Sequence, residues 1–576
     1  MKMHLKCKFP LKQILCALGL ILVISSFQPL SAQSSPIADR LPPGTIFYAQ
    51  WRGKAFLVDA DKQNHLLQLL EDPEFTPLLQ LAAKNLQQNG AKQSAGVKTP
   101  ELADIVSLLD NAAVVGVIAN PTPAEKPASG AASSPVAVFF VYDATGKKEL
   151  IQKLRATARS NEATPVSTYN FGDTAVESRT TGKDTSYTAQ AANYFLYTNQ
   201  KFLIEDLITR FRSGASSTSV AQLPEYQSIR KSFDSGAAIE YFFHMPDLAV
   251  FIPPDQRDQT GARVLRGLQL DKIHVVAGSL SFSGAATRFQ GEILGDTSTG
   301  SLFDVAGPSK ATFSTLSLTG KNSHFSVSRL DLVALYTWIR AAIVASTPPE
   351  KAANVTAMET MAQGFLGMSI SDALGIFTGE IASSSSFTDD GTEQQMFAAT
   401  IQKPADLLRI VRLVGATKIV ADNSAGDTTF LDFAFSYKDP ATGQQQKKFY
   451  YVAVTSQMLV AAPQKDMLRD AIERLKSTAP ATGGIFANPE YLELRARLPE
   501  KLSGLSGSDL AQIPWDKILA NFMNQIEAGM KSQGQAPADL SWLKSIKPGV
   551  ASRHLHMSVG GWWKDTDGIH FDSYVQ

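Results

Sequence analysis

A stretch of 14 residues that occurs twice constrains the fold of this chain more than any other feature. QKFLIEDLITRFRS begins at Gln200 and QKDMLRDAIERLKS begins at Gln464, and the two share six identical positions at an offset of 264 residues. Unrelated segments of this length would share about one. Both copies carry apolar residues at the spacing of an amphipathic helix, so each buries the same face against the same kind of sheet. The pattern predicts a tandem duplication.

Strand and helix patterns accompany each copy in the same order. The first half reads as a strand over 136–142, a helix over 147–159, strand-like runs over 166–179 and 185–197, and a helix over 201–212. The second half reads as a strand over 395–401, a helix over 405–414, strands over 428–437 and 448–461, and a helix over 465–476. We expect an α+β fold of two tandem-duplicated units, each a largely antiparallel sheet with helices packed on one face.

The domain boundaries follow from the same repeat. We predict a signal peptide over 1–32, a first α+β repeat over 33–295, a linker over 296–312 and a second α+β repeat over 313–576. Within the first repeat, residues 120–135 are rich in Pro, Ala and Ser and predict a flexible loop. After each repeated helix comes a Pro-Glu-Tyr string, at Pro224 and at Pro489, which predicts a helix start with Tyr packing back.

The N-terminus is typical of a cleavable secretory signal peptide. Four lysines precede an apolar run over 14–27, and small residues at Ser31 and Ala32 follow it. The run is shorter than the roughly 20 residues that span a bilayer as a helix. An uncleaved N-terminal anchor is the alternative. We expect an extracytoplasmic bacterial protein, periplasmic or secreted, with no integral membrane segment after signal cleavage.

Both cysteines, Cys7 and Cys16, lie inside the predicted signal peptide. The mature chain would therefore be free of cysteine, which excludes disulfides, thiolate catalysis and zinc–thiolate sites. The four signal lysines leave 50 basic against 54 acidic residues, a formal charge of −4. No stretch shows the basic clustering that nucleic acid requires, so we expect no nucleic-acid partner.

No motif in the sequence assigns a catalytic, cofactor-binding or metal-ligating residue, and no cofactor is expected. His554 and His556 are two apart, so on one strand they would share a face and could both bind a metal ion. A hairpin turn at 565–568 would place His570 opposite Trp563, seven residues along the strand from His556. His570 would then be too far from His556 to be a third ligand. Ser228 and Ser541 each begin a Ser-x-x-Lys string without the companion strings of acyl enzymes. The Asp565-x-Asp567-Gly568 string lacks the remaining ligands of a calcium loop and predicts a turn.

The string Leu41-Pro42-Pro43-Gly44-Thr45 and the doubled strand–helix pattern after it resemble an uncharacterised family of exported bacterial proteins, known as a domain of unknown function. These proteins open with an LP-x-x-T-like string soon after the signal peptide. The resemblance implies a bacterial source and an extracytoplasmic location. It implies no activity, cofactor or site residue.

These features predict an exported non-catalytic binding or scaffolding protein. Two alternatives stay open: a periplasmic carrier of an apolar ligand, and a hydrolase whose site is assembled from distant residues and is not visible as a motif. The expected partner is an unknown envelope protein or an apolar ligand. A large apolar cavity would favour the carrier, whereas convergent His, Ser and carboxylate groups in a cleft would favour the enzyme.

The signal peptide gives a first prediction. We expect cleavage between Ala32 and Gln33, because a small residue precedes that bond after the basic and apolar regions. Intact-mass measurement and N-terminal sequencing of the exported protein check it. Recovery of the chain with residues 1–32 still attached would support the anchor instead.

Overall fold

The structure is a computed structural model that describes two compact units. The described residues are 37–57, 62–75, 104, 107–120, 136–160, 166–181, 184–214, 218–234, 236–246, 263, 267–297, 300–319, 323–348, 351–388, 390–438, 444–476, 483–518, 520 and 549–576. The first unit comprises the described residues within Met1–Phe251 and Ala277–Ala285, and the second those within Ile252–Val276, Ala286–Leu543 and Lys547–Gln576. The predicted signal peptide and nearly all of the predicted loop over 120–135 lie outside the described residues.

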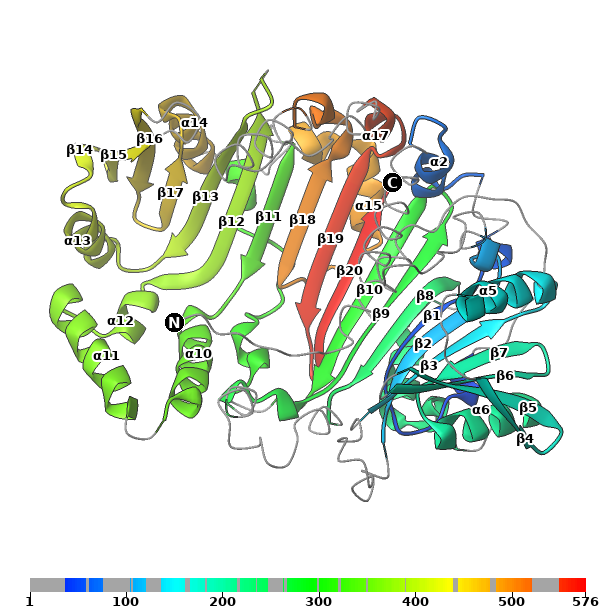
Figure 1. The fold of residues 1–576 in the computed structure, drawn as a ribbon. Helices are drawn as coiled ribbons and strands as arrows, with labels where there is room; N and C mark the ends of the chain where they lie inside the picture. Colours follow the sequence, from blue (N-terminus) through cyan, green and yellow to red (C-terminus); the bar gives the residue numbers. More distant parts are fainter. Residues whose placement is uncertain are drawn as a thin grey trace. The chain divides into compact units, whose positions relative to one another are not determined.

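Helices and strands both contribute, and the twenty described strands form a large antiparallel sheet (Figure 1). The predicted α+β class is therefore confirmed. Among the described helices, none is both long enough and apolar enough to cross a membrane.

Eight strands of the first unit pair in the order β8-β1-β2-β3-β7-β6-β5-β4. Their bounds are β1 Thr45–Trp51, β2 Ala113–Ala119, β3 Val136–Asp143, β4 Val166–Phe171, β5 Thr174–Thr181, β6 Asp184–Ala191, β7 Tyr194–Thr198 and β8 Ala237–His244. Each of the two strand-like runs predicted here is a hairpin of two strands. The turns contain Gly172 and Ala192, both with positive φ, so the chain reverses where a continuous strand was expected.

The helical segments of the first unit are η1 Ile37–Arg40, η2 Lys54–Leu57, α2 His65–Glu71, α5 Lys148–Ser160, α6 Lys201–Ser213, η3 Val220–Gln222 and α7 Pro224–Ser232. The stripe predicted on α6 is buried against β6 and β7, with Leu203, Ile204 and Leu207 fully inaccessible. The Pro-Glu-Tyr string starts α7 as predicted, and Tyr226 packs back on Tyr48 and Phe242.

Helices cover both faces of the first unit's sheet, so the prediction of helices on one face is wrong. Ile151 of α5 packs with Phe140 and Phe195, whereas Phe211 of α6 meets Tyr194. Since successive side chains of β7 point to opposite faces, α5 and α6 lie on opposite sides (Figure 1). The physical reason is that β3, VAVFFVY, is apolar at every position and needs cover on both sides.

Eleven strands of the second unit pair in the order β10-β20-β19-β18-β11-β12-β13-β17-β16-β15-β14. Their bounds are β10 Ala286–Gly295, β11 His324–Arg329, β12 Phe377–Phe387, β13 Glu393–Ile401, β14 Ile419–Ala425, β15 Thr428–Lys438, β16 Gln445–Val454, β17 Met458–Ala462, β18 Gly504–Asp509, β19 Met557–Lys564 and β20 Gly568–Val575; β9, Ile273–Ser283, is divided between the units at Ala277. The predicted strand over 448–461 is again a hairpin, β16 and β17, and β14 was not predicted.

The helical segments of the second unit are η6 Leu270–Lys272, η7 Leu302–Val305, α9 Leu316–Thr319, α10 Leu332–Ser346, α11 Ala352–Leu366, α12 Ile370–Leu374, α13 Pro404–Gly415, α14 Lys465–Lys476, η9 Gly484–Ala487, α15 Pro489–Ala496, η10 Leu510–Gln512 and α17 Gly549–His554. Leu468, Ala471 and Ile472 of α14 join a core cluster with Val460 of β17, and Leu407 of α13 joins a separate cluster with Leu459. Adjacent residues of β17 thus face different helices, so here too helices lie on both faces.

The compact units and the predicted repeats divide the chain differently. Strand β10 lies in the predicted first repeat but belongs to the second unit, because it pairs along its length with β20. The predicted linker is packed in its described part: Phe303 is buried, and Lys310 exchanges backbone hydrogen bonds with Leu502. A boundary between compact units need not be a boundary between duplicated segments, so the domain division stays a prediction.

A buried ion pair ties β11 to β12 in the second unit. Arg329 donates from Nη2 to Glu380 Oε2 at 3.0 Å, and both side chains are almost fully buried. The other oxygen of Glu380 accepts from the Thr315 backbone N–H at 2.7 Å and from the hydroxyls of Ser314 and Thr315. The carboxylate is therefore fully hydrogen-bonded, as a buried charge must be.

Replacement of this carboxylate is expected to destabilise the second unit. Glu380→Ala leaves the Arg329 guanidinium buried without its counter-ion, which costs about 3–5 kcal/mol. The matched control is Asp422→Ala, which breaks the exposed Arg412–Asp422 pair and should cost less than about 1 kcal/mol. Urea unfolding followed by circular dichroism measures both, and equal losses for the two variants would contradict the prediction.

Candidate functional site

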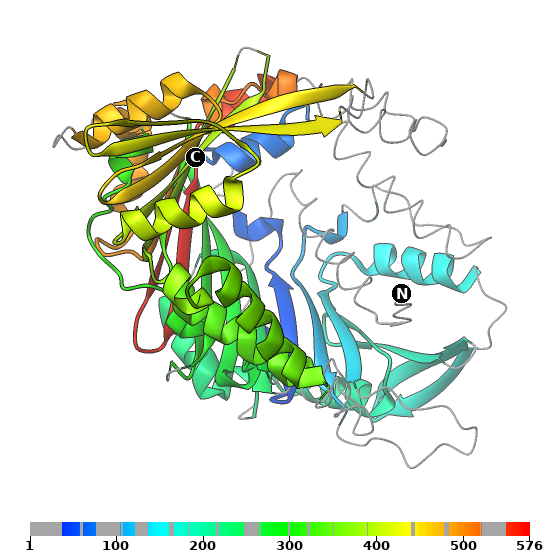
Figure 2. The ribbon, with the colours of Figure 1, turned by 90° about the vertical axis from the view of Figure 1, so that its left-hand side faces the viewer.

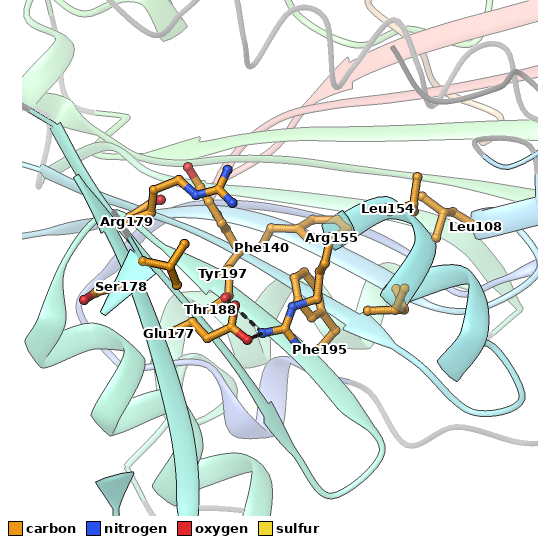
Figure 3. Close-up of a pocket in the computed structure, with 13 residues that line it drawn as sticks. Leu108, Phe140, Leu154, Arg155, Glu177, Ser178, Arg179, Thr188, Phe195 and Tyr197 are labelled. Atoms are coloured by element: carbon orange, nitrogen blue, oxygen red, sulfur yellow. Dashed lines mark hydrogen bonds and ion pairs between the residues drawn. The ribbon is translucent and has the colours of Figure 1, made fainter. Parts of the chain in front are cut away.

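A pocket of about 260 Å³ lies between α5 and the sheet of the first unit (Figure 3). Strands β3, β5, β6 and β7 form its floor. Most of its wall is apolar, and the charged groups gather on one side. The lining residues are Leu108, Phe140, Ile151, Leu154, Arg155, Val166, Glu177, Ser178, Arg179, Ser186, Thr188, Phe195 and Tyr197.

The pocket exists because α5 cannot seal the sheet beneath it. Its described side chains include two large apolar groups directed at the sheet, Ile151 and Leu154, and Ile151 alone of these is buried. On the opposite face, α6 buries five. The aromatic surface of Phe140 and Phe195 is thus covered incompletely, and it lines a cavity where a core would otherwise be closed.

The charged side of the pocket is an ion pair between a helix and a strand. Arg155 of α5 and Glu177 of β5 approach to 2.8 Å, and the side chain of each is about a quarter exposed, at 24%. The guanidinium also lies 5.8 Å from the centre of the Phe195 ring, a cation–π distance. Arg179, two residues after Glu177, approaches from the strand side (Figure 3).

The Arg155–Glu177 pair stands at the junction of two environments. Besides the apolar pocket, it lines a second, polar hollow of about 390 Å³ with Asp173, Gln190 and Arg212. One ligand could place an apolar portion in the first and a polar portion in the second. With Arg179 included, the lining of the pocket contains two guanidinium groups and one carboxylate.

Sequence reasoning did not single out any of these charged residues. Glu177 and Arg179 are two apart on a strand beside the buried Val176, so they share the face opposite the α6 side. Two charged residues on a strand face that a helix covers are a sequence signal for a functional site. A single strand over 166–179 hides this signal, because only the β4–β5 hairpin sets which face of β5 lies beneath α5.

The histidines weighed in the sequence do not converge. His554 ends α17 and His556 precedes β19, so the expectation that both lie on one strand is wrong: residues 549–554 form a helix with Val550 buried. His556 Nδ1 lies 3.2 Å from Glu490 Oε1. Among the described residues, no three His, Cys, Asp or Glu side chains are placed to hold a metal ion.

His570 pairs with Trp563 across the β19–β20 hairpin, as predicted from the turn, and its ring stacks on the indole at 5.4 Å. Asp565, Asp567 and Gly568 form that turn, with Asp565 N–H donating to Gly568 O at 3.0 Å. The predicted turn is confirmed. The ring nitrogens of His570 lie 3.4 Å from Glu292 and 2.9 Å from Asp565.

One serine lies close to a histidine, as a hydrolase would require. His324 Nδ1 of β11 is 2.6 Å from Ser508 Oγ of β18. Burial lowers the pKa of His324, and the charge of Glu393 opposes this weakly. His324 is the first residue of β11 and Ser508 the last but one of β18. Ser508 pairs with His324 on one side and Ser558 on the other, and the N–H of Asp509 donates to the Ser323 carbonyl, so the backbone N–H groups around Ser508 are engaged in the sheet and do not form an oxyanion hole. Ser228 and Lys231 are both exposed on α7, and Ser541 lies outside the described residues.

No family model matches the chain, and no curated protein matches it. Among solved structures, the chain is similar to one described as "Structure of crystal form I of TP0453", with 8% sequence identity, 46% of this chain covered, 81% of that chain covered and a TM-score of 0.23. A likeness this low carries no argument about fold or function.

The His570 cluster gives a pH prediction. Burial disfavours the charged ring, but hydrogen bonds and charge from Glu292 and Asp565 outweigh burial and raise the pKa of His570. A raised folded-state pKa stabilises the protein below the unfolded value and is lost as pH rises through the folded value. The free energy of unfolding of the second unit should therefore fall as the pH rises above about 6.5, the ordinary pKa of histidine.

Urea unfolding at several pH values measures this dependence, and His570→Gln provides the control. The variant should lose most of the slope, since it removes the titrating ring. An unchanged slope in His570→Gln would assign the pH dependence to another group.

Proposed function

We propose that this chain is an exported, non-catalytic binding protein whose first unit holds a small amphipathic acid in the α5 pocket. The apolar part of the ligand lies against Phe140, Leu154 and Phe195, and its acidic group pairs with Arg155. The observation that carries this proposal is the position of the Arg155–Glu177 pair between an apolar pocket and a polar hollow. A ligand carboxylate could take the place of Glu177 on Arg155 without leaving a buried charge unpaired.

The second unit offers a comparison that supports a specific role for the pocket. Its β14–β15 turn contains Gly426-Asp427-Thr428, the same string as Gly172-Asp173-Thr174 in the β4–β5 turn, so Glu177 aligns with Leu431 and Arg179 with Phe433. Leu431 is fully buried, and Phe433 packs directly against Gly415 of α13. Apolar side chains thus stand in the second unit where charged groups line the pocket in the first.

We infer that the two halves arose by duplication. In the first, β8-β1-β2-β3-β7-β6-β5-β4 is the strand order, and replacing each strand by its counterpart gives β18-β11-β12-β13-β17-β16-β15-β14. Helix α6 contacts β6 and β7, and α14 contacts β16 and β17. Tyr226 after the first Pro-Glu string meets Tyr48 of β1, and Tyr491 after the second meets Phe325 of β11. These equivalences support a common ancestor for both halves.

We also propose export and membership of the exported bacterial family that the LP-x-x-T-like start resembles. The basic, apolar and small-residue succession over 1–32 supports the first. The string over 41–45 and the doubled pattern support the second. A periplasmic or secreted location follows from export, and the binding role would then be carried out in the cell envelope.

Calorimetric titration with octanoate and with neutral 1-octanol tests the binding proposal. Octanoate should bind the exported chain, and Arg155→Met should weaken octanoate by about tenfold or more while leaving 1-octanol unchanged. Leu154→Trp should abolish binding of both by filling the pocket, because a packed cavity rejects added volume.

The matched control is Gln152→Trp, which places the same indole on the exposed face of α5. Equal binding by Leu154→Trp and Gln152→Trp would place any bound octanoate elsewhere. If Arg155→Met weakened the binding of octanoate and of 1-octanol equally, the proposed pairing of Arg155 with an acidic group of the ligand would be wrong.

A further inference from the structure

Helices α10 and α11 of the second unit form a hairpin (Figures 1 and 2). Its side chains expose an unusual amount of apolar surface. Met358, Met361 and Phe365 of α11 are 71%, 75% and 59% exposed, and Ile339 and Ile343 of α10 are 42% and 47% exposed. Side chains of this kind are normally covered, and exposed clusters of them mark interaction sites.

These five residues lie on one side of the hairpin. Arg340 of α10 and Glu359 of α11 face each other, at 3.0 Å between Nη2 and Oε2, which fixes the rotation of both helices. At 100° per residue, Ile339 and Ile343 lie to one side of Arg340. Because the two helices run in opposite directions, the stripe of Met358, Met361 and Phe365 lies on that same side of Glu359.

The side of α10 that faces away from α11 is fixed to the protein. Trp338 donates its indole N–H to the Leu268 carbonyl at 2.9 Å. Gly267 lies so close to Ala342 and Ala345 that a β-carbon at Gly267 would approach both to 2.7 Å. The helix is therefore held in place by close packing on one flank, and its apolar flank stays outside.

Several polar side chains of the hairpin find their hydrogen-bond partners within it. The hydroxyls of Thr337, Ser346, Thr347 and Thr360 donate to backbone carbonyls of their own helix, three or four residues earlier. Glu359 accepts from Tyr336 at 2.6 Å as well as from Arg340, which neutralises the ion pair inside the hairpin. This is the arrangement that an apolar medium requires, where hydrogen-bonding groups must find partners internally.

This arrangement favours lipid over a protein as the partner. Protein interfaces contain about one hydrogen bond per 100–200 Å² across the contact. The stripe over 358–365 instead presents Met and Phe, with the neighbouring hydroxyl of Thr360 already engaged. Each helix has 15 residues, about 22 Å in length, which is too short to span a hydrocarbon core of about 30 Å.

We propose that the α10–α11 hairpin docks the second unit on a lipid membrane surface, with Met358, Met361 and Phe365 inserted among the acyl chains. The hairpin lies in the interface and does not cross the bilayer. This role goes beyond ligand binding in the α5 pocket and involves different residues, so the two proposals can fail separately.

Flotation with vesicles of phosphatidylethanolamine and phosphatidylglycerol tests this proposal on the exported chain, after its N-terminus has been verified so that a retained apolar segment cannot produce the binding. The chain should float with the vesicles. The variant Met358→Ser/Met361→Ser/Phe365→Ser should partition about tenfold or more weakly, because three apolar side chains lose their burial. Arg155→Met should float like the unmodified chain. Vesicles of phosphatidylcholine alone should bind as well, since apolar insertion needs no anionic headgroup.

A fluorescent label gives a second measurement that does not depend on the triple variant. Without residues 1–32 the chain has no cysteine, so Met361→Cys can be labelled with an environment-sensitive dye. Vesicles should shift its emission to the blue. The control Leu492→Cys, at a 54% exposed leucine of α15, should show no shift.

Three results would overturn the proposal: no flotation of the unmodified chain, equal flotation of the triple variant, or a blue shift at residue 361 that depends on protein concentration without vesicles. The last would identify a second copy of the chain as the partner.

Discussion

Burial of one helix stripe against antiparallel strands is the interaction on which each unit depends. Leu203, Ile204, Leu207, Ile208 and Phe211 of α6 are all inaccessible, and α14 buries Leu468, Ala471 and Ile472 in the same way. The described residues contain no cysteine and no cluster of side chains placed to hold a metal ion. Apolar burial therefore stabilises their fold without disulfide bonds. Once this face is closed, the sheet's other face is where the two units differ.

The residues on that second face explain the pocket of the first unit, and they differ from their counterparts in the second. The floor strand β3 is apolar on both sides, yet α5 brings Ile151 and Leu154 where α13 brings Leu407, Leu408, Ile410 and Val411. A helix with fewer apolar groups leaves the aromatic floor partly open. The charged pair at its edge then lies between the apolar pocket and the polar hollow, and on this position we base the proposal of an amphipathic ligand. In the second unit, the ring of Phe433 packs against Gly415 of α13, at the position that corresponds to Arg179 in the first unit. One side chain at this position can therefore decide between a closed core and a cavity.

The α10–α11 hairpin differs from α6 and α14 because its apolar side chains are exposed rather than buried. Where α6 and α14 bury their stripes inside the protein, α11 leaves its stripe outside, and its Glu359 and Thr360 find their partners within the hairpin. Hydroxyl groups that donate to their own helix and an ion pair closed by Tyr336 lower the cost of removing the hairpin from water. The pocket and the hairpin thus have the same physical origin: in both places, apolar side chains are more extensive than the neighbouring elements that could cover them.

The sequence by itself determined the α+β class, the stripes of α6 and α14, the helix starts at Pro224 and Pro489, and the turn that sets His570 opposite Trp563. These depend on local periodicity and turn chemistry, which are encoded within a few residues. Only the tertiary structure decided that helices cover both faces, that three predicted strands are hairpins, and that Arg155 meets Glu177. The reason is physical: these two residues are 22 positions apart, and their contact depends on which face of β5 lies beneath α5, a choice made by the hairpin register and by the competing burial of α6 on the other side.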